Sequence, residues 1–145
     1  MARTAAALDL GPDPQAALIE LRSRALELFV SSEYLVQNTF TMLHAVTAME
    51  AASALGRSLP EAQQAALARH AAHALLAARV AFVGRAKLMR APVDTPEGFE
   101  ALVERAVASL DDHSIKLAAA LSVKEGETPE AQRTEALAHW LAVRT

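Results

Sequence analysis

Residues 32–55 read SEYLVQNTFTMLHAVTAMEAASAL, and this stretch decides the fold that we expect of the chain. It is apolar or small around most of a helical circumference and holds only two acidic residues, Glu33 and Glu50. A helix with such a surface has to be covered by other helices. The stretch therefore predicts an all-α protein with this helix at its centre.

One line of polar side chains crosses this apolar helix at spacings of four and three residues. It consists of Gln37, Thr41, His44 and Thr47. Polar groups in a core normally find hydrogen-bond partners, so buried and locally satisfied side chains are the plain interpretation. The functional alternative is a polar binding line of Gln37, Thr41 and His44 that opens onto a cavity or a symmetry axis.

The composition predicts one small helical domain. The chain has 145 residues, of which 52% are hydrophobic and 4% aromatic, with five glycines and six prolines. So few glycines and prolines argue against a fold rich in sheets and tight turns. We expect a flexible N-terminus over residues 1–12 and a single helical-bundle domain over residues 13–145.

The sequence also bears on where the protein works. It contains no cysteine and no run of 18 apolar residues, and its first residues lack a signal-peptide pattern. The missing cysteines exclude disulfides and thiolate metal sites. We expect a cytoplasmic protein that does not associate with a membrane.

Predicted helix starts share one device, a capping side chain close to a proline, whose missing N–H costs nothing in the first turn. They are Asp13–Pro14, Ser58–Leu59–Pro60–Glu61 (also a capping box), Thr95–Pro96 and Thr128–Pro129. The stops are Gly56, Pro92 and Gly126. These signals predict an antiparallel four-helix bundle with a long first helix that kinks or breaks near Ser31 and Ser32, hence four to five helices.

Small residues predict how the first two helices pack. At spacings of four and three, the second helix carries His70, Ala74, Ala77, Ala81, Gly84 and Leu88. The first helix offers Thr41, Ala45, Ala48 and Ala52. Because small faces let helix axes approach to about 8 Å, we expect these two lines to pack on each other.

The histidines give no strong metal motif. His70 and His73 lie three residues apart, but no acidic residue lies between Glu61 and Asp94 to join them, and the Glu-x-x-His pairs of helical di-metal sites do not occur. The run Asp111-Asp112-His113 groups acids with a base, yet adjacent side chains on a continuous helix point in different directions. We therefore expect no metal and no cofactor.

His73 lies in the run AHALLA, residues 72–77, which ends a few residues later in Val83-Gly84. This run resembles the phosphoryl-accepting helix of histidine phosphotransfer domains, which are also four-helix bundles. The resemblance covers about fifteen residues and implies that His73 accepts a phosphoryl group. The sequence departs from the family's His-x-Leu-Lys-Gly pattern, because Leu76 and Ala77 stand where the lysine and the glycine would. That lysine would lie beside the phosphoryl group.

Arg133 and His139 form an Arg-x5-His pair. It resembles the Arg-x4-6-His motif of the HEPN class of helical nucleases, which implies a small ribonuclease. Six residues turn a helix by about 600°, so the two side chains point about 120° apart. The plain interpretation is a solvated helix with positive charge near its C-terminus. No nucleophile elbow, Walker loop or GxGxxG occurs, and a non-enzymatic protein is favoured.

A basic face on the second helix completes the candidates, and it consists of Arg79, Arg85, Lys87 and Arg90. Pairing with acids of the next helix is the economical interpretation, and an acidic protein partner is the functional one. A net charge of -3 and few aromatic residues argue against nucleic acid. The sequence thus predicts a non-enzymatic helical binding, assembly or regulatory protein that self-associates, first of all as a dimer, through its apolar first helix. Phosphotransfer through His73 and RNA cleavage by Arg133 and His139 are the alternatives.

Overall fold

The computed structural model describes residues 10–31, 36–83, 97–123 and 128–143. Every regular element in these ranges is helical. They are α2 (Pro14–Ser31), α3 (Val36–Gly56), α4 (Glu61–Ala78), the π-helical turn η1 (Arg79–Val83), α5 (Phe99–Ala108), α6 (Asp112–Ser122) and α7 (Glu130–Val143). The predicted all-α class is confirmed. The described chain forms six α-helices, however, and not the expected four-helix bundle of four to five helices.

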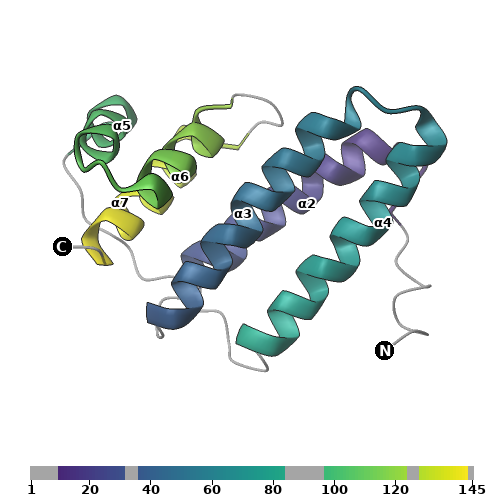
Figure 1. Cartoon of the computed structure of the whole chain (residues 1–145), viewed down its shortest axis with the longest axis horizontal. Coiled ribbons are helices and arrows are strands. Elements are labelled where there is room, and N and C mark those ends of the chain that lie inside the picture. The colour runs from purple at the N-terminus through teal and green to yellow at the C-terminus, as the bar shows by residue number, and fades with distance from the viewer. Residues whose placement is uncertain (1–9, 32–35, 84–96, 124–127, 144–145) are drawn as a thin grey trace.

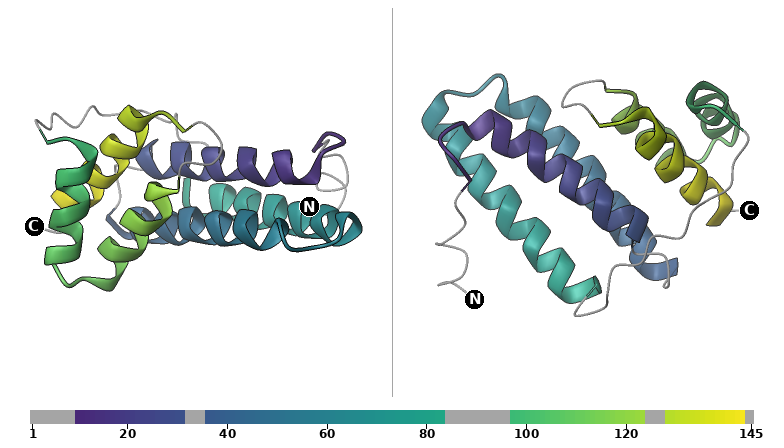
Figure 2. Two further views of the ribbon diagram at one scale, coloured as in Figure 1. Left: turned by 90° about the horizontal axis from the view of Figure 1, so that it is seen from above. Right: turned by 180° about the vertical axis from the view of Figure 1, so that it is seen from behind.

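The helices form two groups, which Figures 1 and 2 show from three directions. The long helices α2, α3 and α4 lie side by side, and η1 extends α4. The shorter helices α5, α6 and α7 pack together beside one end of that group. Contacts of α6 with α3 and of α7 with α2 join the two groups.

The long first helix predicted from the sequence is broken. Helix α2 ends at Ser31, where a kink or break was expected, and α3 starts at Val36. The two helices run antiparallel. The start of α2 therefore lies beside the end of α3, where the side chain of Gln15 donates to the backbone oxygen of Ser53 (3.2 Å). The apolar surface of the stretch is therefore used largely within the chain, where α2 and α3 cover each other.

Helix α4 buries a different face from the one predicted. Its buried residues are Ala68, Ala71, Ala72 and Leu75. His70, Ala74, Ala77 and Ala81 of the predicted small line are exposed, as is Ala48 of the line on α3, and Gly84 and Leu88 lie outside the described residues. The prediction is wrong because α2 folds back beside α3, so that α4 packs against both helices.

The helix starts follow local chemistry in part. The carboxylate of Asp13 accepts from the backbone N–H groups of Gln15 (2.9 Å) and Ala16 (3.1 Å), as expected of an N-cap. The predicted capping box of Ser58 is not formed. Pro60 occupies the N-cap position of α4 without a side-chain cap, and Ser58 donates its N–H to Leu55 in the preceding turn.

The third predicted helix is divided as well. Helix α5 ends at Ala108, and Leu110 adopts a left-handed conformation with φ 56°. Asp111 is extended and caps α6 by accepting from the N–H of Ser114. The core runs through both groups, with Leu18, Phe29 and Leu43 in the first and Leu117 and Trp140 in the second. No described helix is long and apolar enough to cross a membrane.

Candidate functional site

Three rings meet where α3 of the first group lies against α6 of the second. His44, a member of the predicted polar line, lies beside His113, with ring centroids 5.4 Å apart. Phe40, one turn earlier on α3, contacts both rings, at 4.9 Å from His44 and 4.7 Å from His113. The fold thus brings together two histidines that are far apart in the sequence.

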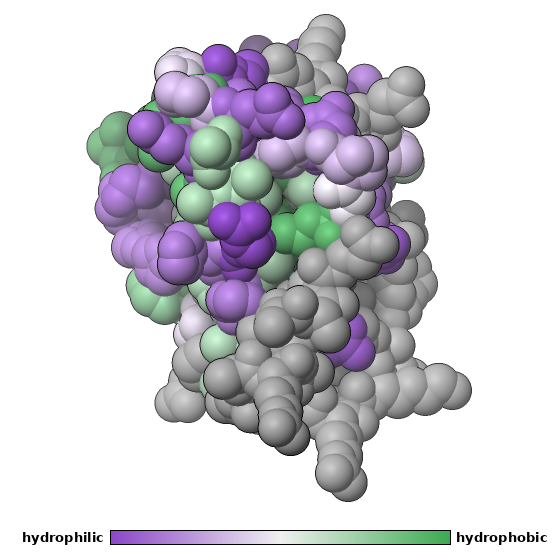
Figure 3. Space-filling model, turned by 90° about the vertical axis from the view of Figure 1, so that its right-hand side faces the viewer, coloured by the Kyte–Doolittle hydropathy of each residue, from purple (hydrophilic) through white to green (hydrophobic). Residues whose placement is uncertain are grey.

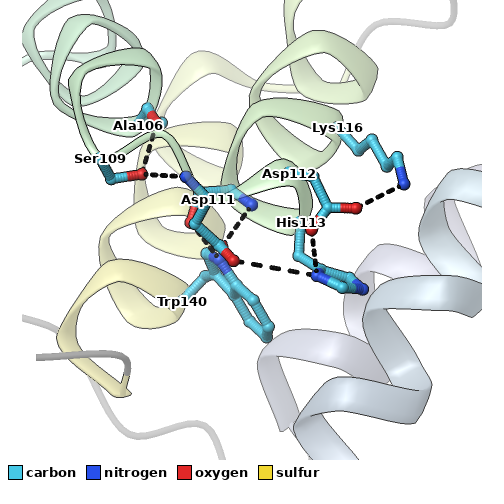
Figure 4. Close-up of polar contacts among 8 residues, drawn as sticks. Ala106, Ser109, Asp111, Asp112, His113, Lys116 and Trp140 are labelled. Atoms are coloured by element: carbon cyan, nitrogen blue, oxygen red, sulfur yellow. Dashed lines mark hydrogen bonds and ion pairs between the residues drawn. The ribbon is translucent and has the colours of Figure 1, made fainter.

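The start of α6 is fixed by a chain of hydrogen bonds (Figure 4). Oδ2 of Asp111 accepts from the N–H (2.9 Å) and the hydroxyl (2.6 Å) of Ser114. The Ser114 oxygen in turn accepts from the indole Nε1 of Trp140 on α7 (2.8 Å). Ser114 and Trp140 are both buried. A buried network therefore holds the carboxylate of Asp111 in one orientation.

The ring of His113 lies between this network and a second carboxylate. Its Nδ1 is 2.8 Å from Oδ1 of Asp112 and 3.9 Å from Oδ1 of Asp111. Lys116 donates from Nζ to Oδ2 of Asp112 (2.8 Å), and this hydrogen bond lowers the pKa of Asp112 below its ordinary value. Burial opposes the shift, and the charges of His113 and Lys116 reinforce it. The lowered pKa favours the ionised form of Asp112.

The sequence did not predict this convergence. The expectation that Asp111, Asp112 and His113 point apart requires a continuous helix, and the chain instead breaks at Leu110. One ligand atom from each of the three side chains lies within 4.8 Å of the other two. The signal that could have been used is an aspartate placed directly before a helical apolar pattern, which is the mark of an N-cap.

The other residues of the predicted polar line are placed as follows relative to the ring cluster, which is the group of Phe40, His44 and His113. The hydroxyl of Thr47 donates to the carbonyl oxygens of Leu43 and His44, both at 3.2 Å, which is the local satisfaction expected in the plain interpretation. Thr41 is half-buried, and Gln37 lies on α3 with its side chain outside the described residues. Of this line, His44 is the residue that the described structure connects to a cluster of titratable groups.

The residues of the two enzymatic alternatives lie elsewhere. His73 is half-buried on α4. Arg133 and His139 are buried on α7, so the expectation of a solvated helix is wrong. Arg133 donates from Nη1 to the backbone oxygen of Leu121 (3.1 Å) and lies over the ring of Phe99, while His139 packs edge-on against Phe29. The reason is that α2, α5 and α6 all contact α7.

A second buried arginine joins the two groups of helices. Arg22 on α2 forms an ion pair with Glu50 on α3. Its Nη2 also donates to the backbone oxygens of Ala120 (3.3 Å) and Val123 (2.8 Å) at the end of α6. Sequence reasoning missed this residue, because one arginine in an amphipathic helix carries no sign of burial.

The second candidate surface is a groove between α2 and α4 with a volume of about 350 Å³. Its lining residues are Leu21, Arg24, Glu27, Leu28, Ala72, Leu75, Leu76 and Arg79. Leu76 and the neighbouring Val80 are exposed large hydrophobic residues. Arg79 is the described member of the predicted basic face, whereas Arg85, Lys87 and Arg90 lie outside the described residues.

The exposed surface of the molecule also includes hydrophobic residues within a polar surround. Figure 3 shows green, hydrophobic side chains gathered inside a border of purple, hydrophilic ones on the side of the molecule that carries the turn between α3 and α4. The proposals below rest on the ring cluster and on the groove between α2 and α4.

In comparisons with known proteins, no family model, no curated protein and no solved structure matches the chain.

Proposed function

We propose that the chain is a non-enzymatic binding and assembly protein that pairs with a second copy of itself. The pairing surface is the α2–α4 face, defined as the groove between these helices together with Leu76 and Val80. The observation that carries the proposal is the exposure of these two apolar side chains beside an apolar groove. Exposed apolar side chains next to a concavity are typical of protein interaction sites.

The charges at the groove favour a symmetric partner. Glu27 of α2 and Arg79 at the end of α4 line the groove from different helices. A two-fold axis presents the same surface on both subunits. Residues of α2 in one subunit can then lie against residues of α4 in the other. In that arrangement the acidic and basic residues that line the groove lie opposite those of the second copy, and both apolar surfaces are covered.

The size of the face predicts a weak dimer. Helices α2 and α4 have 18 residues each, which corresponds to a length of roughly 27 Å. Two such helices cover less than the approximately 800 Å² per partner of a standard interface. Burial of Leu76 and Val80 adds about 1 kcal/mol for each side chain, since both are already partly covered. We therefore expect an equilibrium between monomer and dimer in the micromolar range.

Sedimentation velocity of the full chain over a series of concentrations tests this proposal. We expect the sedimentation coefficient of the unaltered chain to rise with concentration and that of Val80→Glu to stay at the monomer value. Val107→Glu on α5 is the matched control, because Val80 and Val107 are 51% and 52% exposed. A monomer at every concentration, or equal effects of the two substitutions, would contradict the proposal.

The two enzymatic alternatives receive less support. RNA cleavage requires Arg133 and His139 to reach a scissile phosphate, and both side chains are buried among α2, α5 and α6. Phosphotransfer requires His73 to meet a partner domain, and the imidazole is half-buried without the lysine of the family's pattern. Assembly through the α2–α4 face uses side chains that are already exposed.

A further inference from the structure

We propose that Asp111, Asp112 and His113 bind a divalent transition-metal ion, such as Zn²⁺ or Co²⁺, with His44 as the candidate fourth ligand. The site lies at the start of α6, opposite α3 and away from the α2–α4 face. It is independent of the proposed self-association. Its basis is the convergence of carboxylate and imidazole groups from two helices.

The ligand atoms are spaced almost as a metal site requires. Oδ1 of Asp112 and Oδ1 of Asp111 lie 2.8 Å and 3.9 Å from Nδ1 of His113. Nitrogen and oxygen ligands that lie about 2.1 Å from one ion are about 3 to 3.5 Å from each other. The two distances bracket this range, so a small rotation of the exposed Asp112 side chain and of the His113 ring is enough to bring the three atoms around an ion.

The outer oxygens are held by the protein, which orients the inner ones. Oδ2 of Asp111 accepts two hydrogen bonds from Ser114, and Ser114 is fixed by Trp140. Oδ2 of Asp112 accepts from Lys116. Figure 4 shows both carboxylates turned towards the ring of His113. A neutral partner such as Ser114, which fixes a ligand from outside, is usual around metal ions and raises their affinity.

The imidazole of His44 adds a second nitrogen ligand to the two carboxylates and the imidazole of His113. His44 comes from α3, and its ring centroid is 5.4 Å from that of His113. Two imidazoles on one tetrahedral zinc ion have ring centroids about 5 Å apart. Phe40 packs against both rings and limits their movement. Mixed imidazole and carboxylate ligands favour transition metals over Ca²⁺ or Mg²⁺.

Two positive charges work against the ion and provide a sharp test. The ammonium group of Lys116 occupies Oδ2 of Asp112, and the start of α6 carries the positive end of a helix dipole. Removing the ammonium group should therefore strengthen metal binding. A purely structural role of the cluster predicts no such gain, because Lys116 stabilises the ionised carboxylate.

The experiment is a titration of the untagged full chain with Co²⁺, followed by visible absorption, and with Zn²⁺, followed by calorimetry. We expect one ion per chain. Asp112→Asn and His113→Gln should each weaken binding at least tenfold, and Lys116→Gln should strengthen it several-fold. Asp111→Asn removes a carboxylate but keeps an N-cap, because asparagine caps helices as well as aspartate. His73→Gln, a half-buried histidine on α4, is the control and should bind as the unaltered chain does.

Each outcome decides the proposal. Circular dichroism of the metal-free variants confirms that they fold, and Asp112→Asn alters an exposed side chain, so that it tests the site even where His113→Gln does not fold. Absence of binding at millimolar metal overturns the proposal. So does binding that His73→Gln weakens as much as Asp112→Asn. A rise in melting temperature with Zn²⁺ for the unaltered chain, and none for Asp112→Asn, supports it.

Discussion

Helices α2, α3 and α4 contain 18, 21 and 18 residues, whereas α5, α6 and α7 contain 10, 11 and 14. Isolated helices shorter than about 12 to 15 residues are marginal in water. The short group accordingly carries buried polar bonds, from Trp140 to Ser114 and from Arg133 to Leu121. The long group combines close packing, such as that of Leu18 against Gly56, with the ion pair of Arg22 and Glu50.

The two groups of helices are thus stabilised in different ways, and Arg22 connects one group to the other. That residue belongs to the long group, yet it donates to the backbone oxygens of Ala120 and Val123 in the short one. Substitutions that disturb close packing should therefore affect the long group, and substitutions that change backbone conformation at the break between α5 and α6 should affect the short group. Arg22 should affect both.

The largest effect is expected from Arg22→Met. The substitution leaves Glu50 without its ion pair in a largely buried position and leaves the carbonyl groups at the end of α6 without their donor. Breaking a buried ion pair by removing one partner costs about 3 to 5 kcal/mol. Urea-induced unfolding measures the loss as a lower free energy of unfolding.

Arg24→Met on the same helix is the control for this measurement. Arg24 pairs with Glu20 and Glu27 at the surface, where all three side chains are exposed. Exposed ion pairs contribute about 0 to 1 kcal/mol. Equal losses for Arg22→Met and Arg24→Met would show that Arg22 does not join the two groups.

A smaller effect is expected from Gly56→Ala, which tests close packing in the long group. An added Cβ would lie 2.5 Å from Cδ1 of Leu18 and 2.7 Å from Oε1 of Gln15. Leu18 is fully buried and cannot move freely, so the substitution should cost about 1 to 3 kcal/mol. Thermal unfolding should show a lower melting temperature. Gly98→Ala, where nothing lies within 4 Å of an added Cβ, should lower the melting temperature less, because it only replaces the N-cap glycine of α5 by a poorer cap.

The smallest effect, of opposite sign, is expected from Leu110→Asn in the short group. Leu110 is 85% exposed and has φ 56°, a conformation that costs most residues about 1 to 2 kcal/mol and that asparagine adopts more readily. The free energy of unfolding should rise by about 0.5 to 1 kcal/mol. Leu55→Asn, the same substitution at an exposed position of the helix α3, should lower the free energy of unfolding slightly. A loss of stability in Leu110→Asn would contradict the strain at this turn.

The sequence predicted what local chemistry determines. The cap at Asp13, the end of α2 at Ser31 and the end of α3 at Gly56 all follow from residues that act within one turn. The break between α5 and α6 was missed because neither of the residues before Asp111, Ser109 and Leu110, is a glycine or a proline that would mark it. Asp111 is nevertheless the N-cap of α6.

The packing of α4 was mispredicted for a different reason. Alanines occur on every side of this helix, so small residues cannot identify its buried face. Leucines do not identify it either, because Leu75 is buried whereas the adjacent Leu76 is exposed. The candidate metal site needed the fold itself. His44 was identified on its own helix, but its neighbour His113 is supplied by a tertiary contact that no spacing rule describes.

The end of α6 takes its side-chain donors from two arginines, Arg22 and Arg133, that lie far apart in the sequence. Arg22 is made about a hundred residues before its acceptors, since 98 and 101 residues separate it from Ala120 and Val123. Its carboxylate partner Glu50 lies much nearer in the sequence. Arg133, twelve residues beyond Leu121, donates to another carbonyl group near the end of α6. The end of α6 is therefore closed from two sides, and its protection from solvent requires both α2 and α7 to be in place.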